Sequence, residues 1–172
     1  MMYNLEDIKI RIMDITHSSS VDGTGFRDVL FVNYCPHHCE GCHNPETWSK
    51  ENGTYVSLKE VFDDLTKSSM TNVTFSGGEP FEQADQLYVL ACAIKDTGRT
   101  IWIYSGYTFE QLMADDSKRK LLSKCDVLVD GKFDKTKTEL NLKFRGSLNQ
   151  RIIDIQKSLD KGEIVLFDDT FC

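Results

Sequence analysis

Three closely spaced cysteines are the residues of this chain most suited to metal chemistry. Cys35, Cys39 and Cys42 are separated by four and three positions, so one short loop can direct three thiolates toward a common centre. A cube of four irons takes four ligands, so three thiolates leave one iron open for another molecule, whereas a structural zinc ion takes four protein ligands. The spacing alone is compatible with either an iron–sulfur cluster or a structural zinc ion. The neighbouring histidines available as a fourth zinc ligand are His37, His38 and His43.

Polar, glycine-rich turns occur at three other places, each directly after an expected strand. They are Ser76–Pro80, Ser105–Tyr107 and Asp130–Lys132. The cysteine loop follows a strand in the same way. Ligands of parallel α/β sheets bind at the carboxyl ends of the strands, so we expect these turns and the cysteine loop to meet in one site.

Alternating strands and helices must position these loops. β-branched, aromatic or alternating stretches predict strands at residues 8–15, 29–33, 72–75, 100–104, 126–130, 151–155 and 163–167. Ser57 and Glu60 form a capping box that opens one helix, a second helix is expected at about 82–96 before Gly98, and a third begins near Thr108. The alternation implies right-handed crossovers and a mostly parallel sheet of the α/β class. No repeat or low-complexity linker divides the chain, so residues 1–172 are expected to form a single domain.

Composition excludes several classes of function. The chain has 20 basic and 27 acidic residues and a formal net charge of −7, which argues against binding to a nucleic-acid backbone. No stretch approaches the roughly 20 apolar residues that span a bilayer, and the charged stretch 1–13 is not a signal peptide. We therefore expect a cytoplasmic protein with no membrane contact. Of the remaining cysteines, Cys92 and Cys125 are expected in the core and Cys172 is a terminal thiol.

The cysteine triplet and the Ser76–Pro80 turn together resemble the radical S-adenosylmethionine enzymes. Further segments narrow the resemblance to the activating proteins of the anaerobic (class III) ribonucleoside-triphosphate reductases. These segments are Asp22–Arg27, Cys39–Trp48, Asp126–Phe133 and Phe144–Asp154. The resemblance implies a partial, open parallel β/α barrel with the cluster loop after an early strand. The pair His43-Asn44 also resembles the pyruvate formate-lyase activating enzyme, so an activase of that or another glycyl-radical enzyme is the alternative within this class.

The resemblance also implies a cofactor set and a reaction. The three cysteines would hold a [4Fe-4S] cluster whose open iron binds S-adenosyl-L-methionine, and reductive cleavage of that molecule would generate a glycyl radical on the large subunit of the reductase. Glu79 would accept hydrogen bonds from the ligand's ammonium group. The residues expected to contact S-adenosylmethionine are Gly41, Cys42, His43, Asn44, Gly77, Gly78 and Glu79.

The resemblance further implies a flavodoxin-like electron donor. Residues that could hold the partner or the cofactor are Asp22, Arg27, Arg145 and Gln150. The rival class of function is a non-catalytic zinc-binding module that scaffolds a larger assembly.

Overall fold

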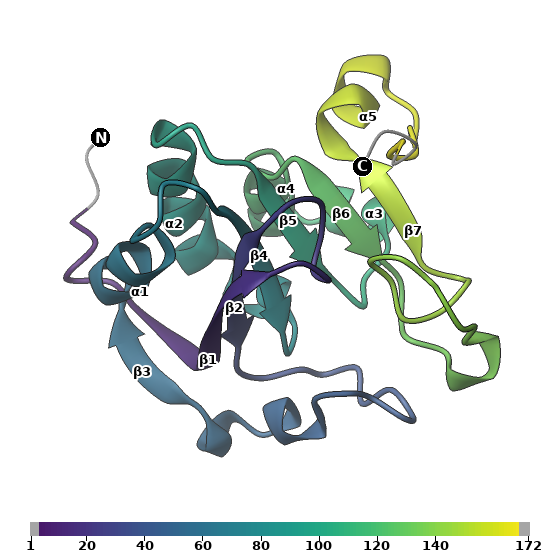
Figure 1. The fold of residues 1–172 in the computed structure, drawn as a ribbon, viewed down its shortest axis with the longest axis horizontal. Helices are drawn as coiled ribbons and strands as arrows, with labels where there is room; N and C mark the ends of the chain where they lie inside the picture. Colours follow the sequence, from purple (N-terminus) through teal and green to yellow (C-terminus); the bar gives the residue numbers. More distant parts are fainter. Residues whose placement is uncertain (1–3, 169–172) are drawn as a thin grey trace.

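Within residues 4–168, which the computed structural model describes, seven strands form one open sheet in the order β3-β1-β2-β4-β5-β6-β7 (Figure 1). The strands are β1 (Lys9–Ser19), β2 (Arg27–Val32), β3 (Thr54–Ser57), β4 (Asn72–Gly77), β5 (Ile101–Tyr104), β6 (Val127–Asp130) and β7 (Arg151–Asp154). The α/β class predicted from the sequence is therefore confirmed. The terminal Cys172 lies outside the described residues.

The centre of the sheet is parallel and its flanks are antiparallel. The pairs β2-β4, β4-β5 and β5-β6 are parallel, whereas β1-β2, β1-β3 and β6-β7 are antiparallel. The connection from β1 to β2 is too short for the crossover that parallel pairing requires. The sequence prediction of a mostly parallel sheet is thus correct for the central strands and misses the antiparallel flanks. The strand predicted at residues 163–167 is wrong, since this segment makes only an isolated bridge between Ile153 and Leu166.

The helices agree with the capping signals in the sequence. They are α1 (Leu58–Leu65), α2 (Ala84–Asp96), α3 (Phe109–Met113), α4 (Asp116–Leu122) and α5 (Ile155–Lys161). Short 3-10 segments are η1 (Pro45–Trp48), η2 (Lys50–Asn52), η3 (Pro80–Gln83) and η4 (Lys135–Lys137). Capping boxes open α1 at Ser57 and α3 at Thr108. None of the helices within residues 4–168 has the length and apolar character needed to cross a bilayer.

The helices bury one face of the sheet, and this face contains most of the core. Apolar side chains of α1, α2, α3 and α4 pack there against residues such as Leu30, Phe75 and Leu128, all of them fully buried. Cys125 belongs to this core as predicted, whereas Cys92 on α2 is only partly buried. The other face carries a smaller cluster around Trp102. The cysteines of the loop are not among the residues of the main cluster.

The carboxyl ends of the central strands point to one side of the molecule. In Figure 1, β4 and β5 end on the side where the loop after β2 passes. The long connection from Gly131 to Gln150, between β6 and β7, has only η4 as regular structure. An ion pair between Lys135 of this connection and Glu40 of the cysteine loop joins the two segments. The rim of the sheet is thus built from loops, which is where sites of parallel α/β proteins occur.

Candidate functional site

The three clustered cysteines lie on one irregular loop and line one cavity of about 250 Å³. The loop follows β2, and the other walls of the cavity come from the turns after β4, β5 and β6. The predicted site residues that line this cavity are Cys35, Cys39, Cys42, His43, Asn44, Gly77 and Gly78. The expectation that the polar turns and the cysteine loop meet at the carboxyl rim of the sheet is confirmed. Gly41 and Glu79, which the sequence also indicated, are not among the lining residues.

A residue with positive φ stands directly before each cysteine of the loop. The φ angles are 83° at Tyr34, 49° at His38 and 77° at Gly41. Few non-glycine residues adopt this left-handed region, and each such residue costs about 1 kcal/mol or more. Three left-handed turns in eight residues therefore bend the chain repeatedly, which allows cysteines four and three positions apart to face one cavity.

Packing holds the loop in this bent conformation. The backbone amide of Tyr34 donates to Thr47 (2.8 Å), and its carbonyl accepts from the amide of Glu79 (2.8 Å). The ring of His38 stacks on Trp48 with 4.7 Å between centroids. Gly41 packs against the 131–137 segment, where a Cβ on Gly41 would lie 3.3 Å from a Lys135 carbon. The role of Gly41 in the structure is thus to support the loop.

The two glycines of the turn after β4 are required by close approach to β2. A Cβ on Gly77 would lie 2.5 Å from the backbone nitrogen of Val32, and a Cβ on Gly78 would lie 2.3 Å from the carbonyl oxygen of Tyr34. Neither distance is compatible with a side chain. These glycines, which the sequence indicated as S-adenosylmethionine contacts, also let the turn lie against the start of the cysteine loop.

The carboxylate of Glu79 points into the protein and is completely buried. It accepts hydrogen bonds from the backbone amides of Phe81 (3.1 Å) and Gly106 (2.8 Å), from the Ser105 hydroxyl (2.9 Å) and from His37 Nε2 (2.8 Å). Its acceptor capacity is used by these internal donors. The expectation that this carboxylate accepts hydrogen bonds from a ligand's ammonium group has no support in this arrangement.

The three histidines considered as a fourth zinc ligand have other neighbours. His37 is hydrogen bonded to Glu79, His38 stacks on Trp48, and His43 lies 5.1 Å from the ring of Phe133. Within residues 4–168, no three His, Cys, Asp or Glu side chains are grouped closely enough to hold a single metal ion. The three thiols instead surround a cavity. This donor set fits a cube, which spreads its cysteine ligands over separate iron atoms.

Burial controls the charge of one of the thiols. Desolvation raises the pKa of Cys35 to about 11, although a hydrogen bond from the backbone amide of His37 opposes that shift. Cys35 is therefore neutral near pH 7 in the metal-free protein. Metal ligation requires the thiolate, so binding at this site must displace a proton.

The residues that the sequence linked less specifically to partner or cofactor fall into two groups. Asp22 and Gln150 line the cavity. Arg27 is buried (1% exposed) beside Trp102, with its guanidinium donating to the carbonyls of Val73 (2.6 Å) and Thr100 (3.1 Å). Arg27 is therefore a structural residue that ties β2 to β4 and β5.

Gln150 and Arg145 shape the turn between β6 and β7. The Gln150 side chain donates to the carbonyl of Gly131 (2.9 Å) and accepts from the amide of Gly146 (2.8 Å). Arg145 donates to the carbonyl of Gln150 (2.7 Å). Both side chains fix the conformation of the segment that walls the cavity on the β6 side.

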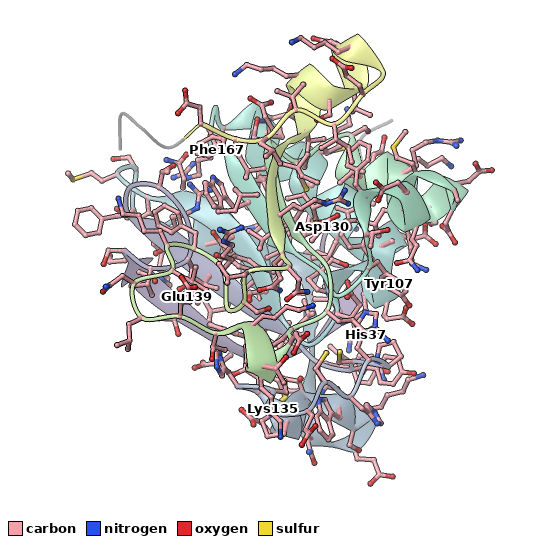
Figure 2. All side chains as sticks on the ribbon, turned by 90° about the vertical axis from the view of Figure 1, so that its right-hand side faces the viewer. His37, Tyr107, Asp130, Lys135, Glu139 and Phe167 are labelled. Atoms are coloured by element: carbon pink, nitrogen blue, oxygen red, sulfur yellow. The ribbon has the colours of Figure 1, made fainter. Side chains whose placement is uncertain are left out.

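The sequence did not single out three side chains at this site. His37 was considered only as a zinc ligand, and no role was predicted for Ser105 or Tyr104, which line the cavity. Figure 2 shows His37 close to Tyr107, whose rings meet edge to face with 4.5 Å between centroids. The position of Ser105 directly after β5, in a turn already marked as polar, is the signal that could have identified it.

Known proteins resemble this chain over most of its length. A family described as a 4Fe-4S single cluster domain matches residues 21–153, so the chain belongs to this class of iron–sulfur proteins. Anaerobic ribonucleoside-triphosphate reductase-activating proteins align with it as well. The identities are 39% for Vibrio cholerae over 77% of this chain and 90% of the relative, 37% for phage T4 over 77% and 86%, and 33% for Escherichia coli K12 over 76% and 89%.

Within the iron–sulfur class, the chain is a member of the anaerobic ribonucleoside-triphosphate reductase-activating protein family. Among solved structures, QueE from Escherichia coli is similar, with a TM-score of 0.52, 18% identity, and coverage of 60% of this chain and 55% of that one. This likeness shows a shared open α/β fold. The family resemblance and the fold class inferred from the sequence are confirmed.

Proposed function

We propose that this chain holds one [4Fe-4S] cluster on Cys35, Cys39 and Cys42 and, with S-adenosylmethionine, generates a glycyl radical on the anaerobic ribonucleoside-triphosphate reductase. The observation that carries the proposal is a set of three thiols that line one cavity, while His37, which lies between Cys35 and Cys39, is hydrogen bonded to Glu79. A cube held by three cysteines keeps one iron free for a ligand. The names of the relatives support the choice of partner.

In this proposal the residues of the chain bind and orient the cofactors, and the cofactors supply the reactive groups. Held by Cys35, Cys39 and Cys42, the cluster together with S-adenosylmethionine would supply the one-electron radical chemistry that takes a hydrogen atom from a glycine of the partner. Gly77 and Gly78 offer backbone groups at the cavity wall beside the cysteine loop, and His43 and Asn44 extend the wall beyond Cys42. These four residues are the proposed contacts of S-adenosylmethionine.

The glycine of a protein substrate must reach the same cavity. The 131–150 segment borders it through Gly131, Phe133, Gly146 and Gln150, and its largely exposed position leaves room for a partner. We propose that residues 1–172 act as one domain in the cytoplasm, with a flavodoxin-like protein as electron donor.

Electron paramagnetic resonance of the mixed proteins tests the proposal. The reconstituted chain is mixed without oxygen with the cognate reductase, a reductant and S-adenosylmethionine. A glycine-centred doublet on the reductase is expected, together with 5′-deoxyadenosine in solution. The doublet should be absent when Cys39→Ala replaces the intact chain.

A parallel reaction distinguishes the alternative partner. Pyruvate formate-lyase replaces the reductase under the same conditions. A doublet on pyruvate formate-lyase alone would contradict the proposed partner while retaining the radical chemistry. No 5′-deoxyadenosine in either mixture would contradict the radical chemistry itself.

A further inference from the structure

One buried carboxylate joins the loops that follow three successive strands of the parallel sheet. Glu79 belongs to the turn after β4, and its side chain is fully buried (0% exposed). Its oxygens accept from Ser105 Oγ (2.9 and 3.0 Å) and the Gly106 amide (2.8 Å), both in the turn after β5. They also meet His37 Nε2 at 2.8 Å, and His37 belongs to the cysteine loop after β2. A buried carboxylate with this many donors fixes the groups around it.

His37 is the member of this network that reaches it from the cysteine loop. It stands between Cys35 and Cys39, and its side chain is 7% exposed. The other partners of Glu79 are donors, so the ring nitrogen that faces the carboxylate carries the hydrogen and donates it. The ring lies edge to face against Tyr107 at 4.5 Å between centroids. A Cβ on Gly106 would lie 2.3 Å from His37 Cδ2, so the ring has no free space on that side.

The hydrogen bond between His37 and Glu79 links the cysteine loop to the turn that contains Gly77 and Gly78. The cysteine loop has no regular secondary structure between Cys35 and Cys42, and the turn with Gly77 and Gly78 is the neighbouring wall of the cavity. Hydrogen bonds beyond the ligands orient ligand-bearing residues and tune the metal. A displacement of about 1 Å between reacting groups can lower a rate by a factor of about 100.

We propose that His37 and Glu79 are a positioning pair that holds the Cys35–Cys39 arm of the loop at a fixed distance from the Gly77-Gly78 turn. The inference rests on the proposed function, because its purpose is to keep the open iron within reach of S-adenosylmethionine. Neither side chain ligates the cluster. Glu79 acts on the ligand site through His37 and through the turn after β5.

His37→Leu, reconstituted in the full chain, tests the pair. Leucine fills most of the volume of the imidazole and removes the hydrogen bond. His37→Gln is the rescue variant, because its side-chain amide can donate to Glu79. His17→Asn is the control for loss of a histidine outside the loop, since His17 on β1 is half-exposed and its ring lies near Asp28 and Asp64. Gly106→Ala is an independent variant that should displace the His37 ring from outside the loop.

Three quantities are measured for each variant. They are the iron and sulfide content, the change that S-adenosylmethionine causes in the paramagnetic resonance spectrum of the reduced cluster, and the kinetics of S-adenosylmethionine cleavage. We expect His37→Leu and Gly106→Ala to keep their iron but lose the spectral change. Cleavage efficiency should fall roughly 10- to 100-fold, mainly through KM. His37→Gln should stay within about threefold of the parent chain because it restores the donor, and His17→Asn should match the parent.

Two results would overturn the pair. A His37→Leu variant with parental spectra and cleavage would show that the hydrogen bond positions nothing. A variant that loses its iron would show that the pair serves cluster assembly. A parent chain that binds no cluster or cleaves no S-adenosylmethionine would contradict the proposed function, and the positioning role with it. An active parent with an equally active His37→Leu variant would contradict the positioning role alone.

Discussion

Each cysteine of the loop is preceded by a residue in the left-handed backbone region, and this regularity determines where the three sulfur atoms lie. Tyr34 and His38 adopt that region without being glycine, so contacts with Thr47, Glu79 and Trp48 must offset its cost. The positions of the thiols are thus a property of the whole loop. The cavity they line is the feature on which the account of the site depends.

Removal of any one thiol should eliminate the cluster. Two cysteines cannot hold a cube that already lacks a fourth protein ligand, so Cys35→Ala, Cys39→Ala and Cys42→Ala should each contain less than a tenth of the parent's iron after anaerobic reconstitution. Iron analysis and the visible absorption spectrum measure this. Cys92→Ala on α2, a partly buried cysteine away from the loop, is the control and should keep the full complement.

Gly78→Ala should disrupt the cluster loop as well as the turn to which it belongs. The new Cβ would lie 2.3 Å from the carbonyl oxygen of Tyr34, which adjoins Cys35. We expect loss of both iron and S-adenosylmethionine binding, measured by iron analysis and equilibrium dialysis. Gly98→Ala is the control without a clash, because a Cβ there meets nothing within 4 Å, and it should keep its iron although its φ of +81° adds backbone strain that Gly78 does not have. Normal iron content in Gly78→Ala would contradict the packing described here.

The three cysteines that line the cavity could be singled out from the sequence, but their supporting contacts could not. Three cysteines within eight residues indicate a metal-binding loop because neighbouring positions of one short segment are close in space in any fold. The contact between His37 and Glu79 joins residues 42 positions apart, and no local pattern encodes it. For the same reason, Glu79 was expected to meet a ligand, whereas the fold directs its carboxylate into the protein.

Among the elements, the parallel central strands place the loops of the site at one edge of the sheet. Antiparallel strands flank them on both sides. Arg151 at the start of β7 holds the last strand to β6. It donates to both carboxylate oxygens of the buried Asp130 (3.0 and 2.5 Å) and to Glu110 on α3 (2.9 Å). These two carboxylates raise the pKa of Arg151 above its usual range. The ion pair between Arg151 and Asp130 therefore fixes both ends of the 131–150 segment, which forms one wall of the cavity.

Arg151→Ala should destabilise the fold measurably. It leaves Asp130, which is 1% exposed, as a buried carboxylate without its cation. A fully buried pair costs 3–5 kcal/mol when one partner is removed, and the one-third exposure of Arg151 reduces our expectation to about 2 kcal/mol. Urea unfolding of the metal-free protein measures the free energy.

Arg119→Ala on α4 is the matched control for that variant. Its ion pair with Asp116 is exposed, so we expect a change below about 0.5 kcal/mol. Equal losses of unfolding free energy in Arg151→Ala and Arg119→Ala would show that the burial of Asp130 does not increase the cost of removing its partner.

Elements with local signals were the predictable part of the fold. The capping boxes at Ser57 and Thr108 and the four central strands follow from patterns of a few residues. The short strand β3 pairs with β1 across more than 40 positions, and its sequence, Thr54–Ser57, has too few residues for a clear period. The segment 163–167 has a strand-like composition, yet it makes only one bridge, because side-chain pattern does not show whether a pairing partner is available.

For the whole molecule, the core and the metal site are separate structures. The main cluster of buried side chains lies between the sheet and its helices, and the cysteines of the loop are not part of it. Metal removal should therefore leave the sheet folded. We expect the metal-free chain to keep its far-ultraviolet circular dichroism and a cooperative urea transition, unlike zinc fingers, which unfold without metal. An unfolded metal-free chain would show that the cluster is part of the fold.

A cluster bound by three cysteines should have one iron free to bind S-adenosylmethionine. Electron–nuclear double resonance of the reduced cluster, with the ligand labelled at its amino nitrogen, tests whether the ligand binds that iron. We predict an isotropic hyperfine coupling from the labelled nitrogen, because unpaired spin density reaches that nucleus through a bond to a cluster iron. A fully formed cluster that shows no such coupling, or a colourless protein with one zinc per chain, would contradict the account.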